Sequence, residues 1–130
     1  MRIEEYFLEI KGIVDSSSIV HLSNITYEKR GTHEGFISGR LQFIDNTVLE
    51  WREFIDVEII EDRLMYVYHY MTSSKGIIFR YDNTGHNKKL DLPTYPHHKH
   101  DGSEENVLSA RAMDLGEILQ EIASIVKIPT

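Results

Sequence analysis

Histidines and a lysine gather in one short segment, Pro96–His100. Imidazole donates or accepts a proton near neutral pH, and a neighbouring lysine stabilises an anion. Metal-independent RNA cleavage needs these groups: one removes the 2′-hydroxyl proton, another protonates the leaving oxygen, and a cation stabilises the phosphorane. In an extended chain His98 and His100 share a face about 7 Å apart, which suits an acid–base pair. The segment predicts His98 and His100 as catalytic proton-transfer groups and Lys99 as their cation.

A second segment, Phe79–Asn83, carries an arginine and an aspartate two residues apart. The alternation of a strand puts Arg80 and Asp82 on one face and their neighbours on the other. The planar fork of arginine suits phosphate or carboxylate, so we expect Arg80 to hold phosphate and Asp82 to orient a histidine. A surface ion pair followed by a turn is the structural alternative. We expect substrate contacts from four further residues: Tyr81, Asn83, His97 and His86.

The histidines also suit a metal ion, with Asp82, His86 or His69 as further ligands. However, neither an HExxH motif nor a two-His-one-carboxylate spacing stands out along the chain. The sequence has no cysteine, which excludes disulfides, thiolate metal sites and thiol nucleophiles. We therefore predict no metal and no other cofactor, and retain a metal-dependent site as an alternative. A solvated polar loop is the alternative without function.

Charge is distributed unevenly along the chain. The net charge is −7, which argues against a generic nucleic-acid coat protein. Between Lys75 and His100, however, five basic residues stand against two acidic ones, a surplus of 5 − 2 = 3 before any histidine is protonated. A basic, histidine-rich segment on an acidic body indicates a local anion site.

Hydrophobic periodicity predicts one α+β domain over residues 1–130. Helical spacing of apolar residues predicts helices over 2–15 and 114–127, the second capped by Asp114. Residues 19–82 predict about five strands joined by short turns, which is typical of an antiparallel meander. We expect the helices to pack on one face of this sheet and tyrosines and charged groups to line the open face. Residues 82–106 are rich in polar residues and structure breakers and predict an irregular functional loop.

The N-terminus carries acidic residues where a signal peptide would carry basic ones. No apolar run approaches the roughly 20 residues that span a bilayer. We expect a cytoplasmic protein without membrane contact.

The order of these elements and two motifs resemble the TumE-type toxins of bacterial and archaeal toxin–antitoxin pairs. The motifs are FRYDN at Phe79–Asn83 and LPTYPHHKH at Leu92–His100, and the stretch Gly39–Phe54 is similar to the family's small hairpin. The resemblance implies a small toxin neutralised by a cognate antitoxin. The chain departs from the family in its spacer, Thr84–Lys89, which has one histidine where relatives tend to have a second histidine-rich stretch. This departure weakens any metal site that needs a histidine pair there.

Our preferred hypothesis is therefore a toxin that cleaves RNA as a metal-independent ribonuclease. A non-catalytic module that binds a partner protein or nucleic acid is the first alternative. A metal-dependent nuclease or a nucleotide-transferring toxin is the second. The sequence leaves the oligomeric state open, a homo-oligomer included.

Overall fold

The computed structural model describes residues 1–85 and 92–127. In these residues two helices flank a run of seven strands. In chain order the elements are α1 (Ile3–Asp15), β1 (Val20–Lys29), β2 (Glu34–Phe43), β3 (Val48–Asp56), β4 (Asp62–Met71), β5 (Ile77–Asp82), β6 (His98–Asp101), β7 (Val107–Ser109) and α2 (Leu115–Ile125). Neither helix is long and apolar enough to cross a membrane.

Each strand pairs antiparallel with the strand that follows it, in the order β1 to β7. Short turns join the first five strands. In the β2–β3 turn Asn46 has φ 70°, a left-handed conformation that asparagine tolerates, and Asp45 accepts two hydrogen bonds from Thr47. The predicted α+β class and antiparallel meander are confirmed.

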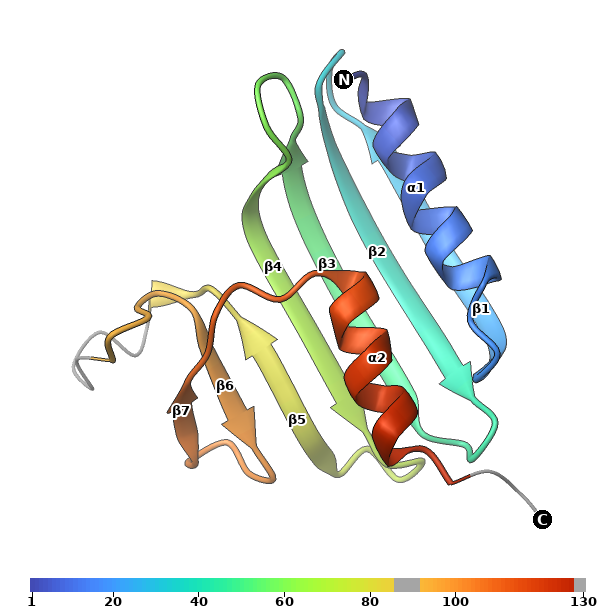
Figure 1. Ribbon diagram of the computed structural model, residues 1–130, viewed down its shortest axis with the longest axis vertical. Coiled ribbons are helices and arrows are strands. Elements are labelled where there is room, and N and C mark those ends of the chain that lie inside the picture. Colours follow the sequence, from blue (N-terminus) through green and yellow to red (C-terminus); the bar gives the residue numbers. More distant parts are fainter. Residues whose placement is uncertain (86–91, 128–130) are drawn as a thin grey trace.

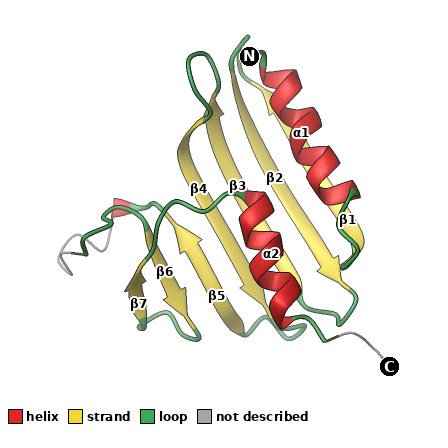
Figure 2. Ribbon diagram, viewed as in Figure 1, coloured by secondary structure: helices red, strands yellow, loops and turns green. Residues whose placement is uncertain are grey.

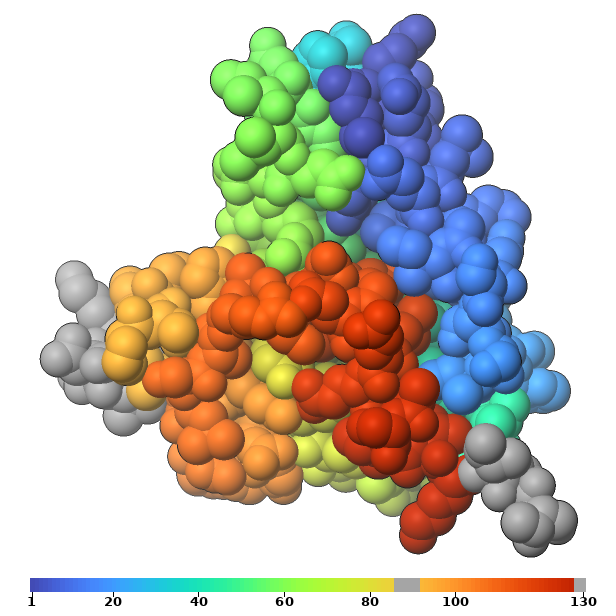
Figure 3. All heavy atoms as spheres, in the orientation of Figure 1, coloured from blue at the N-terminus to red at the C-terminus, as the bar shows by residue number. Residues whose placement is uncertain are grey.

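Both helices lie on the same face of the sheet, α1 along β1 and α2 over the central strands, as Figure 1 and Figure 2 show. A space-filling view of that face shows the helices and the segment before α2 covering much of the sheet (Figure 3). Asp114 caps α2, since its side chain accepts a hydrogen bond from the Glu117 backbone N–H and the Glu117 carboxylate accepts one in return. Each helix buries a stripe at helical spacing: Ile3, Tyr6, Ile10 and Val14 in α1, and Leu115, Ile118, Leu119 and Ile122 in α2.

Alternation along the strands decides what lies under the helices. Trp51 and the tyrosines of β4 are buried in the core, and Gly39 on β2 makes room for the Trp51 indole. The expectation that tyrosines line the open face is therefore wrong, because Tyr66, Tyr68 and Tyr70 all point towards the helices. On β4 the residues between these tyrosines, Val67 and His69, lie on the open face, beside polar residues of the neighbouring strands such as Arg40, Glu50 and Arg52.

The irregular loop predicted over residues 82–106 is also partly wrong. It contains β6, which pairs with β5, and β7 follows directly after it, so the sheet has seven strands rather than about five. Both added strands are short, and β6 has the sequence His-Lys-His-Asp. Such a segment has no apolar alternation of its own, and pairing with a neighbouring strand is what orders it.

Candidate functional site

Pairing between β5 and β6 brings the arginine-containing segment Phe79–Asn83 next to the histidine-rich segment Pro96–His100. Arg80 lies opposite His100 and Asp82 lies opposite His98. Directly opposed residues of an antiparallel pair point to the same face of the sheet. These four side chains, here called the β5–β6 cluster, therefore share the face that the helices do not cover.

The polar atoms of the β5–β6 cluster lie within hydrogen-bonding distance of one another. His98 Nε2 is 2.9 Å from Asp82 Oδ1 and 3.1 Å from His100 Nε2. Arg80 donates from Nε to Asp82 Oδ2 at 3.1 Å, and its Nη2 lies 3.1 Å from His100 Nε2. Alternation predicted that Arg80 shares a face with Asp82 and that His98 shares one with His100, and the register of β5 with β6 brings these two pairs together.

Backbone carbonyls orient both imidazole rings. His98 Nδ1 lies 2.9 Å from the Pro96 carbonyl oxygen and His100 Nδ1 lies 2.8 Å from that of Glu104. A carbonyl oxygen only accepts, so both Nδ1 atoms carry hydrogen and donate. In a neutral ring this leaves a lone pair on Nε2, and two such lone pairs facing each other at 3.1 Å repel.

One proton resolves this repulsion. Because Arg80 can only donate, His100 Nε2 accepts in that contact, and the 2.9 Å contact of His98 Nε2 with the Asp82 carboxylate needs a hydrogen on His98. The two rings are therefore arranged as a hydrogen-bond donor, His98, and an acceptor, His100.

Asp82 is the anion of the cluster. Burial raises its pKa, but hydrogen bonds from the Thr84 hydroxyl and backbone N–H, the charge of His98 and the hydrogen bond from Arg80 lower the pKa below its ordinary value. The carboxylate therefore stays ionised and balances the neighbouring positive charge.

Asp82, His98 and His100 also meet the geometric requirements for a metal ion. Their ligand atoms all lie within 4.8 Å of one another, and all three residues are buried. Anchoring of Nδ1 on a backbone carbonyl, as in both rings here, is the usual orientation of metal-binding histidines. Asp82, His98 and His100 would hold a divalent cation, which would act as a Lewis acid there. The sequence had offered Asp82 as one of three possible further ligands for these histidines, and the pairing of β5 with β6 is what brings Asp82 rather than His69 to them.

Access to the cluster is restricted. The exposed fractions of Asp82, His98 and His100 are only 1–2%, whereas the Arg80 side chain is 20% exposed and donates from Nη1 to Glu104 at 2.7 Å. Arg80 is therefore the member of the cluster that solvent reaches.

Lys99 does not join the cluster, contrary to the sequence-based expectation. Its Nζ lies 3.0 Å from Glu121 of α2 and 5.0 Å from the centre of the Tyr81 ring. Tyr81 also donates to Glu121, at 2.6 Å. The physical reason is alternation: the period that unites His98 with His100 sends Lys99 and Tyr81 to the opposite face, beneath α2.

The remaining predicted substrate contacts lie against β4 or outside the described residues. Asn83 accepts a hydrogen bond from the Tyr66 backbone N–H at 2.9 Å. His97 stacks on the Tyr66 ring and hydrogen-bonds its hydroxyl at 2.8 Å. These contacts tie the ends of β5 and β6 to β4. His86 lies outside the described residues.

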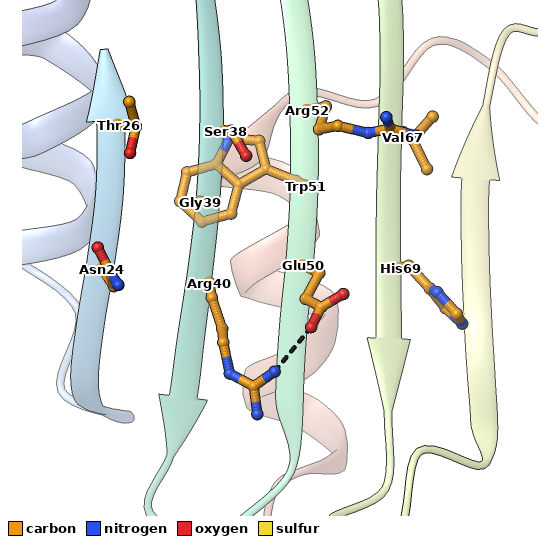
Figure 4. A pocket seen from close by; sticks show the side chains of 10 residues that line it. All are labelled: Asn24, Thr26, Ser38, Gly39, Arg40, Glu50, Trp51, Arg52, Val67 and His69. Atoms are coloured by element: carbon orange, nitrogen blue, oxygen red, sulfur yellow. Dashed lines mark hydrogen bonds and ion pairs between the residues drawn. The ribbon is translucent and has the colours of Figure 1, made fainter.

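Sequence reasoning missed a polar groove beside the cluster. It spans β1 to β4 on the uncovered face and includes Arg40, Arg52 and His69 among its lining residues (Figure 4). Alternation along β4 favours His69 as a core residue on an apolar face, together with Val67 and Met71, and this interpretation is wrong because the tyrosines of β4 fill the core and leave His69 on the open face. The hollow itself needs side chains from several strands at once, for which the sequence carries no local signal.

Comparison with known proteins gives one match. A family described as "Toxin TumE" matches residues 10–126, which is most of the chain. No curated protein and no solved structure matches.

Proposed function

Since this chain belongs to the TumE toxin family, the toxin side of a toxin–antitoxin system, we propose that it acts on RNA as a metal-independent ribonuclease whose centre is the β5–β6 cluster. Family membership also implies a cognate antitoxin. The observation that carries the proposal is the contact of the two imidazoles, His98 and His100, whose Nε2 atoms lie 3.1 Å apart beside Asp82 and Arg80.

The proposed chemistry gives each of the two rings one role. His100 accepts the proton of a ribose 2′-hydroxyl, whose oxygen attacks the adjacent phosphorus. The bond from phosphorus to the 5′ oxygen breaks, His98 supplies the proton of that leaving oxygen, and the products are a 2′,3′-cyclic phosphate and a 5′-hydroxyl. Arg80 balances the charge on the phosphate. Because the two Nε2 atoms contact each other in this structure, the rings must separate as the phosphate binds between them.

Metal-dependent cleavage is a second candidate, supported by the spacing of Asp82, His98 and His100. In that case the three side chains would hold a divalent cation that activates water or a hydroxyl group. The two candidates use the same residues and differ in their response to a chelator.

The decisive experiment measures cleavage of total RNA by the purified protein, with and without chelator. His100→Asn is the most informative variant, because the asparagine amide can keep the hydrogen bond to Glu104 while Nε2 is lost. His21→Ala, an exposed histidine on β1, is the matched control. Circular dichroism checks that each variant is folded.

Chelator-resistant cleavage that is lost in His100→Asn and retained in His21→Ala supports the metal-independent proposal. Cleavage that a chelator abolishes and one divalent ion restores selects the metal-dependent candidate. If the folded protein cleaves no RNA under either condition, the ribonuclease proposal is refuted and a binding module takes its place.

A further inference from the structure

A polar groove crosses the uncovered face of the sheet from β1 to β4, here called the β1–β4 groove. Figure 4 shows the side chains of β1, β2, β3 and β4 that line it. Its volume is about 420 Å³, and its lining residues include Asn24, Thr26, Ser38, Arg40, Arg52 and His69. Ligand pockets range over roughly 300–1,000 Å³, so the groove is of a size for one small ligand unit.

The charge of the groove favours an anion. Arg40 and Glu50 form an ion pair at 2.7 Å and neutralise each other (Figure 4). Arg52 is exposed, and none of the ion pairs found in residues 1–85 and 92–127 includes it. The lining therefore presents one unbalanced positive charge on a polar surface.

His69 connects this groove to the β5–β6 cluster. In the strand register it lies between Glu50 of β3 and Arg80 of β5, and Arg80 in turn lies opposite His100. Burial lowers the pKa of His69, and the charge of Arg80 lowers it further, so the ring is neutral at neutral pH. Its Nε2 is buried and has no hydrogen-bond partner within the described part of the chain. The groove wall thus holds an unused polar atom beside the exposed edge of the cluster.

The other lining groups match the parts of a nucleotide. Asn24 offers an amide, and Thr26 and Ser38 offer hydroxyl groups, which together suit sugar hydroxyls and base edges. Arg52 on β3 and Arg80 on β5 are two strands apart and are also offset by two residues along the strands, which together give about 12 Å at the usual strand dimensions. That separation suits two phosphates on a short stretch of one nucleic-acid strand, whereas a groove of this volume is too small for a duplex.

We infer that the β1–β4 groove holds a nucleotide of single-stranded RNA next to the phosphate on which the β5–β6 cluster acts, with Arg52 on a neighbouring phosphate. This inference rests on the proposed function for its substrate. It assigns Arg52 a binding role and leaves proton transfer to the cluster.

The test measures binding of a single-stranded 2′-fluoro RNA oligonucleotide, which lacks the attacking hydroxyl, to the full chain by fluorescence anisotropy. We expect Arg52→Ala to weaken binding about tenfold, the loss of one charge-assisted hydrogen bond. The slope of log K against log salt should fall in magnitude by about 0.7, the contribution of one phosphate contact on a single strand. Arg30→Ala, an exposed arginine at the end of β1, is the matched control and should bind within twofold of the wild type. Ser38→Trp fills the groove and should also weaken binding.

Kinetics separate this inference from the proposed function. Arg52→Ala should raise KM more than it lowers kcat, whereas His100→Asn should lower kcat. Binding that depends on Arg52 in a protein that cleaves no RNA refutes the ribonuclease and leaves the groove in place. Unchanged binding and KM in both Arg52→Ala and Ser38→Trp overturn the groove, as does an equal loss in Arg30→Ala. The inference is also overturned if the protein binds duplex RNA as tightly as single-stranded RNA, or if it binds no RNA. It is overturned too if Arg52→Ala loses binding to the antitoxin and keeps its binding to RNA.

Discussion

Replacing Gly39 by alanine should destabilise the protein, because the position faces a fixed aromatic ring. Gly39 on β2 lies opposite Trp51 on β3 and on the same face of the sheet. A Cβ atom at Gly39 would lie 2.4 Å from Cη2, 2.5 Å from Cζ3 and 2.7 Å from Cζ2 of the indole. Trp51 is only 1% exposed, so its ring has no solvent to move into. One added methyl group therefore overpacks the core.

The size of the effect follows from two opposing contributions. Overpacking a core costs about 1–3 kcal/mol, and three contacts below 3 Å from a single atom point to the upper part of that range. Replacing glycine by alanine inside a strand otherwise gains about 0.5–1 kcal/mol, because the unfolded chain loses conformational freedom. We expect Gly39→Ala to lower the free energy of unfolding by about 2 kcal/mol.

Urea unfolding measures this change, with Gly12→Ala as the matched control. An added Cβ at Gly12 in α1 meets nothing within 4 Å, so the same substitution there should stabilise the protein by up to about 1 kcal/mol. In a Trp51→Phe background the smaller ring should remove most of the penalty at Gly39. The reasoning is refuted if Gly39→Ala is as stable as the wild type, or if its penalty is the same in the Trp51→Phe background.

Two further predictions concern the helix-covered face. Burial raises the pKa of Glu53, and the hydrogen bond from Tyr6 and the charge of Arg63 offset this only in part. The folded state therefore binds the proton of the Glu53 carboxyl group more tightly than the unfolded state does. The free energy of unfolding should therefore fall as pH rises above about 4.5 towards the raised pKa, and parallel pH profiles for wild type and Glu53→Gln in urea unfolding would contradict this. Lys99→Met should lose about 0.5–1 kcal/mol with the ion pair to Glu121. Because Lys99 lies on the face away from the cluster, the folded variant should cleave RNA at the wild-type rate, and a large fall in kcat would return Lys99 to the mechanism.

Much of the fold follows from periodicity in the sequence. Apolar residues at helical spacing identified both terminal helices, and Asp114 marked the start of the second. Alternation along the segment 48–55 predicts that Arg52 and Glu53 face opposite sides, and the structure agrees: Arg52 is exposed on the open face, whereas Glu53 is fully buried beneath the helices. These features are local, so the sequence carries a direct signal for them.

Features that depend on distant parts of the chain could not be predicted in the same way. β6 has a sequence of charged and imidazole side chains, and its strand geometry comes from pairing with β5. The convergence of Asp82 with His98 and His100 likewise needs that register, since 15 residues separate Asp82 from His98 in the sequence. The β1–β4 groove needs several strands at once.

Alternation divides each of the two family motifs into two groups. In the first motif Phe79 and Tyr81 pack into the core, while Arg80 and Asp82 belong to the β5–β6 cluster. In the second motif Lys99 forms an ion pair with α2, while the histidines on either side of it, His98 and His100, belong to the cluster. Each motif therefore alternates residues that stabilise the fold with residues that belong to the candidate site. Substitutions at Phe79, Tyr81 and Lys99 should consequently act through stability, and substitutions at Arg80, Asp82, His98 and His100 should act on the chemistry of the folded protein.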